Sequence, residues 1–380
     1  MGLLSDIFSG KKTYSSSHLK EKVLTLTIAG ATIFSPINTV AAKTVPFKDK
    51  VSDKTEIVQN QDSLRIQTDS VTAKFSDFRL KNAAERMMKT QTGRSVLTKL
   101  TQKNIPVEMS SEIASDLGGA YFPASKKILI NPACSNDLIA SILVHEGTHA
   151  LQAANGCRLG PQLNMESYIN LNKAMEADAM KNQLFAAAEL KDLGDASVYK
   201  EFAREHSMLV KSYERFCEKY GEQRDSIAKH TMLAYYNNRS YVKTYENRYV
   251  NALETFYKAA QKSNTPGIFQ KDISKAEIIH RICHLDGKHY MNEADTLFLQ
   301  DSARNYVMKS TYNSLEKLSK KHAVFLNNNP VFKQDTSYQK FYIVDYKGRV
   351  LRNPTKGQNS PYTTKPIKTA LSYHKQRNGR

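Results

Sequence analysis

Apolar residues recur three and four positions apart along most of the chain, and this spacing predicts mainly helices. Residues 78–104 follow it and are expected to form one or two helices. Three shorter segments, residues 105–110, 118–122 and 127–131, are instead rich in β-forming residues. A short turn containing Pro and Ser joins the last two, so we expect a β-hairpin there.

The segment after this hairpin predicts a strongly apolar helix. Ser135, Asn136 and Asp137 are candidate N-caps before it, and Asn155–Gly156 form a stop signal after it. Steps of four, three and four residues place a series of its side chains on one helix face, namely Leu138, Ile142, His145 and His149.

Helical spacing continues through most of the remaining chain. The residues near the C-terminus read FYIVDYKGRVLR and predict a second hairpin, which turns at Lys347–Gly348. Between the two hairpins we expect helices over residues 164–191, 195–263, 272–285 and 295–322.

The apolar helix carries a candidate metal-binding motif. His145, Glu146 and His149 form the pattern H-E-x-x-H. Residues four apart on a helix lie above one another, so both histidines can bind one Zn²⁺ ion. Glu146 lies beside them and can act as a general base toward water activated by the metal. Burying these three polar groups with nothing to pair them would be costly, which favours the metal site.

A catalytic zinc ion needs three protein ligands and an open position. The next helix carries Glu176 and Asp178, which are some 200° apart around the helix axis, so only one of them can face the ion. We expect Glu176 to be the third ligand because its side chain reaches farther. Asp178 is then expected either to support the ligands without touching the ion or to be the third ligand in place of Glu176. Glu166, near the start of this helix, is a weaker candidate.

Peptide hydrolysis also needs a donor for the oxyanion of the tetrahedral intermediate. The sequence leaves four candidates open: Tyr121, His230, Tyr235 and Tyr236.

A second constellation, HRICHLDGKH, spans residues 280–289. His280 and His284 are again four apart, with Cys283, Asp286 and His289 close by. We interpret His280 and His284 as a structural pair. The alternatives are that this segment forms a second metal site or that it extends the first one.

The order of TGRSVL, G-G-A-Y, H-E-x-x-H-A-x-Q and E-x-D-A resembles a bacterial family of zincin-type metallopeptidases over about residues 78–260. Activity in that family is itself inferred from the motif. The resemblance implies zinc ligation by His145, His149 and Glu176, with Glu146 as the base. Better-studied zincins with a glutamate ligand have an aspartate four residues after it, where this chain has Met180.

The fold expected is therefore α+β and mostly helical, zincin-like, with a small antiparallel sheet or hairpin packed on the H-E-x-x-H helix. The function expected is a zinc-dependent peptidase that uses one Zn²⁺ ion and acts on a peptide or protein. One alternative is a non-catalytic basic protein that binds nucleic acid or an anionic surface. A secreted toxin or effector with the same zincin chemistry is another.

The charge of the chain, +18 from 55 Lys and Arg against 37 Asp and Glu, is concentrated near its end. Residues 340–380 contain ten Lys or Arg and one acid, so they contribute +9. This basic tail favours an anionic partner, although it also fits a solubilising tail.

No apolar run reaches the roughly 18 residues of a membrane span. The run over residues 23–34, preceded by lysines and followed by Val40-Ala41-Ala42, fits a secretory signal cleaved after Ala42. It predicts a secreted or periplasmic protein, with a cytoplasmic protein as the alternative. The domain limits expected are 1–42 for the signal or targeting segment, 43–75 for a linker, 76–322 for the peptidase domain and 323–380 for the basic tail.

The four cysteines suit an oxidising compartment, but they also fit buried free thiols. Cys134 and Cys157 bracket the apolar helix, about 30 Å apart at 1.5 Å per residue. They cannot be bridged to each other, because disulfide Cα atoms lie within about 7 Å.

Overall fold

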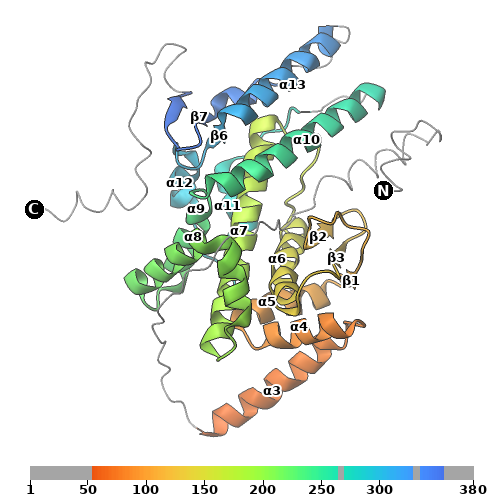
Figure 1. Ribbon diagram of the computed structural model, residues 1–380, viewed down its shortest axis with the longest axis vertical. Helices are drawn as coiled ribbons and strands as arrows, with labels where there is room; N and C mark the ends of the chain where they lie inside the picture. Colours follow the sequence, from red (N-terminus) through yellow and green to blue (C-terminus); the bar gives the residue numbers. More distant parts are fainter. Residues whose placement is uncertain (1–53, 264–268, 328–333, 355–380) are drawn as a thin grey trace, which may run out of the picture.

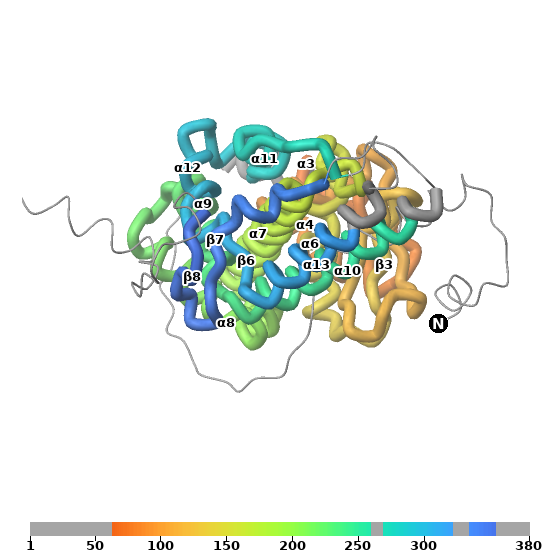
Figure 2. Tube along the Cα trace, turned by 90° about the horizontal axis from the view of Figure 1, so that it is seen from above, coloured from red at the N-terminus to blue at the C-terminus, as the bar shows by residue number. Residues whose placement is uncertain are grey.

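A long helix, α7 (Met165–Asp192), runs through the middle of the molecule, as the computed structural model shows (Figure 1). The structure describes residues 54–263, 269–327 and 334–354. Nearly every residue of α7 is buried, because helices pack against it on all sides. Viewed from above, α7 lies between α11 and α8 (Figure 2).

The apolar helix that carries the H-E-x-x-H motif is α6 (Asn136–Ala154), and it lies alongside α7. The Ser135 side chain caps it by accepting a hydrogen bond from the Leu138 amide, and Gly156 follows its end with φ +87°. The other helices are α3 (Lys54–Thr72), α4 (Phe78–Met88), α5 (Gln91–Gln102), α8 (Ser197–Tyr220), α9 (Arg224–Tyr235), α10 (Arg239–Ser263), α11 (Lys275–Ile282), α12 (Thr296–Gln300) and α13 (Lys309–Asn327).

The hairpin expected before α6 is confirmed. Strands β2 (Gly119–Phe122) and β3 (Lys127–Ile130) pair antiparallel, with Tyr121 opposite Ile128. Strand β1 (Val107–Met109) adds to β3 in parallel, so the sheet is mixed and β2 forms one of its edges. Tyr121 belongs to the main core and its neighbour Ala120 to a small cluster on the other face, as the alternation of a strand requires. The sheet packs on α6, and the chain is mostly helical, as expected.

The C-terminal hairpin is also confirmed, with β7 (Tyr342–Val344) and β8 (Val350–Arg352) antiparallel and Gly348 at φ +77° in the turn. The single helix expected over residues 295–322 is wrong. Strand β6 (Tyr306–Met308) interrupts it, because its backbone pairs in parallel with β7 and so prefers the sheet to a continuous helix. The tail hairpin therefore shares a sheet with the segment before it.

The linker expected over residues 43–75 contains a helix, α3, so this prediction is wrong over residues 54–72. This helix contains few apolar residues, so the sequence shows no clear apolar spacing that would predict it. The predicted signal segment and most of the basic tail lie outside the described residues, so export and the anionic partner stay predictions. No helix in the described part is long and apolar enough to cross a membrane.

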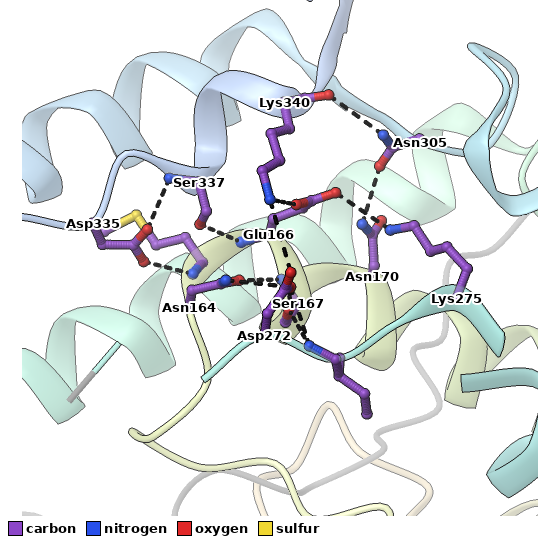
Figure 3. Close-up of polar contacts among 12 residues, drawn as sticks. Asn164, Glu166, Ser167, Asn170, Asp272, Lys275, Asn305, Asp335, Ser337 and Lys340 are labelled. Atoms are coloured by element: carbon purple, nitrogen blue, oxygen red, sulfur yellow. Dashed lines mark hydrogen bonds and ion pairs between the residues drawn. The ribbon is translucent and has the colours of Figure 1, made fainter. Parts of the chain in front are cut away.

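A polar network fixes the N-terminus of α7 (Figure 3). The Asn164 side chain caps the helix by accepting a hydrogen bond from the Ser167 amide at 2.8 Å. The Met165 amide donates to Asp335 at 2.7 Å, and the Ser167 hydroxyl donates to Asp272 at 2.7 Å. Segments far apart in the sequence therefore meet at the start of the helix that carries Glu176.

Glu166 belongs to this network and does not reach the metal-ligand candidates. Its carboxylate pairs with Lys275 at 3.4 Å and with Lys340 at 3.2 Å (Figure 3). Ten residues of helix, about 15 Å at 1.5 Å per residue, separate it from Glu176. The prediction of Glu166 as a weaker candidate for the third ligand is therefore wrong.

Candidate metal centre

Two histidines of α6 face each other in the core. His145 and His149 are 0% and 1% exposed, and their Nε2 atoms lie 3.1 Å apart. The four-residue spacing predicted that they share one helix face, and the structure brings them together on the side that faces α7.

Helix α7 brings Glu176 to the same point. Its carboxylate oxygens lie 3.5 Å from His145 Nε2 and 3.4 Å from His149 Nε2. The ligand atoms of the three side chains all lie within 4.8 Å of one another, and all three residues are buried. This His-His-Glu cluster is an arrangement that can hold a metal ion.

Two glutamines set the orientation of the histidine rings. His145 Nδ1 lies 3.0 Å from Gln183 Oε1, and His149 Nδ1 lies 2.9 Å from Gln152 Oε1. The amide orientation of Gln152 is unambiguous because its Nε2 donates to Asp178 Oδ2 and to the Met175 carbonyl. Since an amide oxygen only accepts, each Nδ1 carries the hydrogen, and the Nε2 lone pairs face Glu176.

These lone pairs and the carboxylate would repel one another without a positive charge between them. Burial by itself lowers the pKa of His149, but the charges of Glu176 and Glu146 and the hydrogen bonds of this histidine together outweigh burial and raise this pKa to about 9. Glu176 Oε2 is buried without a hydrogen-bond partner. Either a proton on His149 or a divalent cation supplies the missing charge, and the two-nitrogen, carboxylate donor set fits such a cation.

Glu146 lies beside the cluster and contacts the edge strand. Its Oε2 accepts a hydrogen bond from the Tyr121 amide at 3.0 Å, while its Oε1 is buried without a partner. Burial, assisted by the charge of Glu176, raises the pKa of Glu146 to about 8. The close approach requires glycine in β2, because a Cβ on Gly119 would lie 3.0 Å from Glu146 Cγ and 2.6 Å from Ile142 Cγ2.

Asp178 does not join the cluster, and it is Glu176 that the structure brings to the two histidines. Asp178 instead accepts hydrogen bonds from Gln152 at 3.0 Å and from the Tyr290 hydroxyl at 2.7 Å, and it pairs with Lys181 at 3.1 Å. It therefore orients Gln152, which in turn orients His149.

The four candidate oxyanion donors lie in different surroundings. The Tyr235 hydroxyl is buried without a partner, and after burial the charge of Glu176 contributes most to raising its pKa. His230 stacks on Tyr220, with ring centroids 4.8 Å apart, and its Nε2 lies 2.8 Å from the Tyr220 hydroxyl. The Tyr236 carbonyl accepts a hydrogen bond from Tyr306 in the C-terminal part of the core. Tyr121 reaches Glu146 through its backbone amide.

Sequence reasoning missed several side chains near the cluster. His206 is 3% exposed at a break inside α8, where its backbone departs from helical angles with φ −120° and ψ 37°. Its ring contacts Tyr241 with centroids 5.1 Å apart, and the Tyr241 and Tyr245 hydroxyls lie 3.1 Å apart. A lone histidine within a helical pattern gave no signal of this placement.

The constellation at residues 280–289 does not extend the cluster. Helix α11 ends at Ile282, so the expectation that His280 and His284 share a helix is wrong, because His284 begins strand β4 (His284–Leu285). Its carbonyl accepts a hydrogen bond from Lys181 at 3.2 Å. All four cysteines of the chain are free.

The fold and this cluster define a mostly helical protein with a buried His-His-Glu site beside an edge strand. Residues 57–291 match the Putative metallopeptidase family (DUF6782). The match covers more than half of the chain, so the protein belongs to this family. No curated protein and no solved structure matches the chain significantly.

Proposed function

We propose that the protein is a zinc-dependent peptidase of the zincin type, with His145, His149 and Glu176 as the ligands. The observation that carries the proposal is the convergence of these three buried side chains, with both Nε2 lone pairs turned toward the carboxylate. His145, His149 and Glu176 would hold the ion through two nitrogen atoms and one carboxylate, a ligand set that catalytic zinc sites use. When bound, the zinc ion supplies a Lewis acid that activates water at neutral pH.

Glu146 is the general base in this proposal. The Tyr121 amide occupies Oε2 and so holds the carboxylate in place, which leaves the unpartnered Oε1 to accept a proton from the attacking water. The same oxygen then passes the proton to the departing amine nitrogen.

Tyr235 is the best placed of the candidate donors for the oxyanion. Its buried hydroxyl has no partner and is sensitive to the charge of Glu176. Donating this hydrogen bond to the tetrahedral intermediate would offset the cost of burying a hydroxyl without a partner.

The position of strand β2 at the edge of the sheet is the argument for a polypeptide substrate. The Tyr121 amide points away from β3, since it donates to Glu146, and the carbonyl of the same residue points the same way. Because this amide is already bonded to Glu146, the Tyr121 carbonyl is the acceptor that an extended peptide would meet at this edge, beside the base and the ligands.

Replacing the base tests this function. Glu146→Gln keeps the metal ligands but removes the proton acceptor, so peptide hydrolysis should fall about 10²–10⁴-fold with metal content unchanged. The assay follows cleavage of a denatured protein and of peptide mixtures by mass spectrometry. Glu108→Gln, the same change on β1, should retain full activity. Full activity in Glu146→Gln would overturn the proposal.

A further inference from the structure

Three histidines gather around a short hairpin outside the His-His-Glu cluster. Strand β4 pairs with β5 (Lys288–His289), and His284 lies directly opposite His289, with ring centroids 4.1 Å apart. His280, in the last turn of α11, stacks its ring on His289 at 5.1 Å. For comparison, the two histidines of the cluster have centroids 4.8 Å apart.

Two polar atoms of this hairpin are buried without hydrogen-bond partners. His284 Nδ1 and Asp286 Oδ1 are both buried and make no hydrogen bond. His284 and Asp286 line a cavity of about 40 Å³ together with Gln152 and Asp178. His280 and His289 do not line this cavity, which has room beside His284 for water molecules of about 10–15 Å³ each.

We propose that His280, His284 and His289 form a second binding site for a divalent transition-metal ion such as zinc, separate from the His-His-Glu cluster. Imidazole nitrogens suit such ions, and directly paired strand positions with one further residue from the preceding helix supply three of them. Asp178 and Gln152 lie between this site and His149, so the two sites do not share a ligand. The site goes beyond the proposed function and does not depend on it.

Binding requires two rings to turn. The rings of His280 and His289 are nearly parallel, with an interplanar angle of 20°, so they must rotate to direct nitrogens at one ion. Both residues are exposed, so other side-chain rotamers are accessible to them.

Zinc binding to the untagged full chain tests the site. The wild type should bind two ions in equilibrium dialysis, and His284→Ala should weaken one of them at least tenfold. His145→Ala should lose the other ion and keep the hairpin ion. Lys288→Ala changes an exposed residue of β5, next to His289, without removing a ligand, and should still bind two ions.

His289→Asn provides a second variant should His284→Ala fail to fold, because His289 is exposed; it should also lose one ion. Equal zinc binding by the wild type and His289→Asn would overturn the site. An ion that His289→Asn loses and His145→Ala retains supports the site even if the His-His-Glu cluster binds nothing. Failure of the hairpin site and failure of the His-His-Glu cluster to bind zinc are therefore distinguishable.

Discussion

At the scale of residues, the site depends on how each ligand is held. Gln183 and Gln152 each present a carbonyl oxygen to a histidine Nδ1, which directs Nε2 toward Glu176. Asp178 fixes Gln152, and the Tyr290 hydroxyl fixes Asp178. The metal affinity should therefore depend on side chains that do not touch the ion.

Removing the glutamine that orients His149 tests this dependence. Gln152→Ala should lower the zinc affinity of the cluster about 10–100-fold, because His149 loses its fixed tautomer and Asp178 loses a donor. Competition with a chromophoric chelator measures the affinity. Gln102→Ala, an exposed position on α5, serves as the control. Unchanged affinity in Gln152→Ala would contradict the role of the glutamine.

Buried His206 should make the fold sensitive to acid. Burial, followed by the charge of His145, lowers its pKa to about 3 in the folded protein, against about 6.5 in the unfolded chain. Between these values the unfolded chain binds a proton that the folded protein does not. The free energy of unfolding contributed by neutral His206 is therefore complete above pH 6.5 and falls as the pH drops toward 3.

His206→Gln should flatten this dependence between pH 6.5 and 4. Urea unfolding at a series of pH values in metal-free buffer measures the slope. His280→Gln, an exposed histidine, should leave the slope close to that of the wild type. An unchanged slope in His206→Gln would show that His206 does not remain neutral in the fold.

At the scale of elements, the contact between β2 and α6 places the edge strand over Glu146. Gly119→Ala should push the strand away, because its Cβ would lie 2.6 Å from Ile142 Cγ2. We expect a loss of about 1–3 kcal/mol of stability together with lower peptidase activity. Thermal unfolding and the peptide assay measure both effects, with Ser125→Ala in the turn of the same hairpin as control. Wild-type stability and activity would contradict this packing.

The elements that could be predicted from the sequence have strong local signals. Helix α6 shows caps and helical spacing, and the two hairpins have alternating strands and turn residues. Helix α3 was missed because it is polar, and β6 because its pairing with β7 is not local. In the same way, the spacing of His145 and His149 predicted their meeting, whereas Gln183, Tyr290 and His206 reach the site only through tertiary contacts.

At the scale of the whole molecule, buried charges on α7 connect the site to the C-terminal part of the chain. Lys173 and Glu246 are both 0% exposed and pair at 2.5 Å, and Lys173 also donates to the Tyr306 carbonyl. Glu246 accepts a further hydrogen bond from the Met308 amide at 3.0 Å. This links α7, α10 and β6.

Breaking this pair should be costly for the whole fold. Lys173→Met leaves Glu246 charged and buried, so we expect a loss of about 3–5 kcal/mol in unfolding free energy. Urea denaturation measures it. Lys320→Met on α13 removes an exposed lysine that is paired with Glu316, and should leave the unfolding free energy close to that of the wild type. Equal stability of the two variants would contradict the role of the buried pair.

Access to the centre is also a property of the whole molecule. His145, Glu146, His149 and Glu176 are each at most 3% exposed, so a polypeptide reaches them only when part of the surrounding wall moves. The side chains from α8, α9 and α10, among them His206, Tyr235 and Tyr241, form part of this wall.

The central claim is that His145, His149 and Glu176 bind one metal ion. Anomalous X-ray scattering at the zinc edge, recorded from crystals of the zinc-loaded protein, tests it most directly. We predict a peak between the two Nε2 atoms and the Glu176 carboxylate, at about 2.0–2.2 Å from each ligand atom. A zinc-loaded crystal with no peak at this position would contradict the claim.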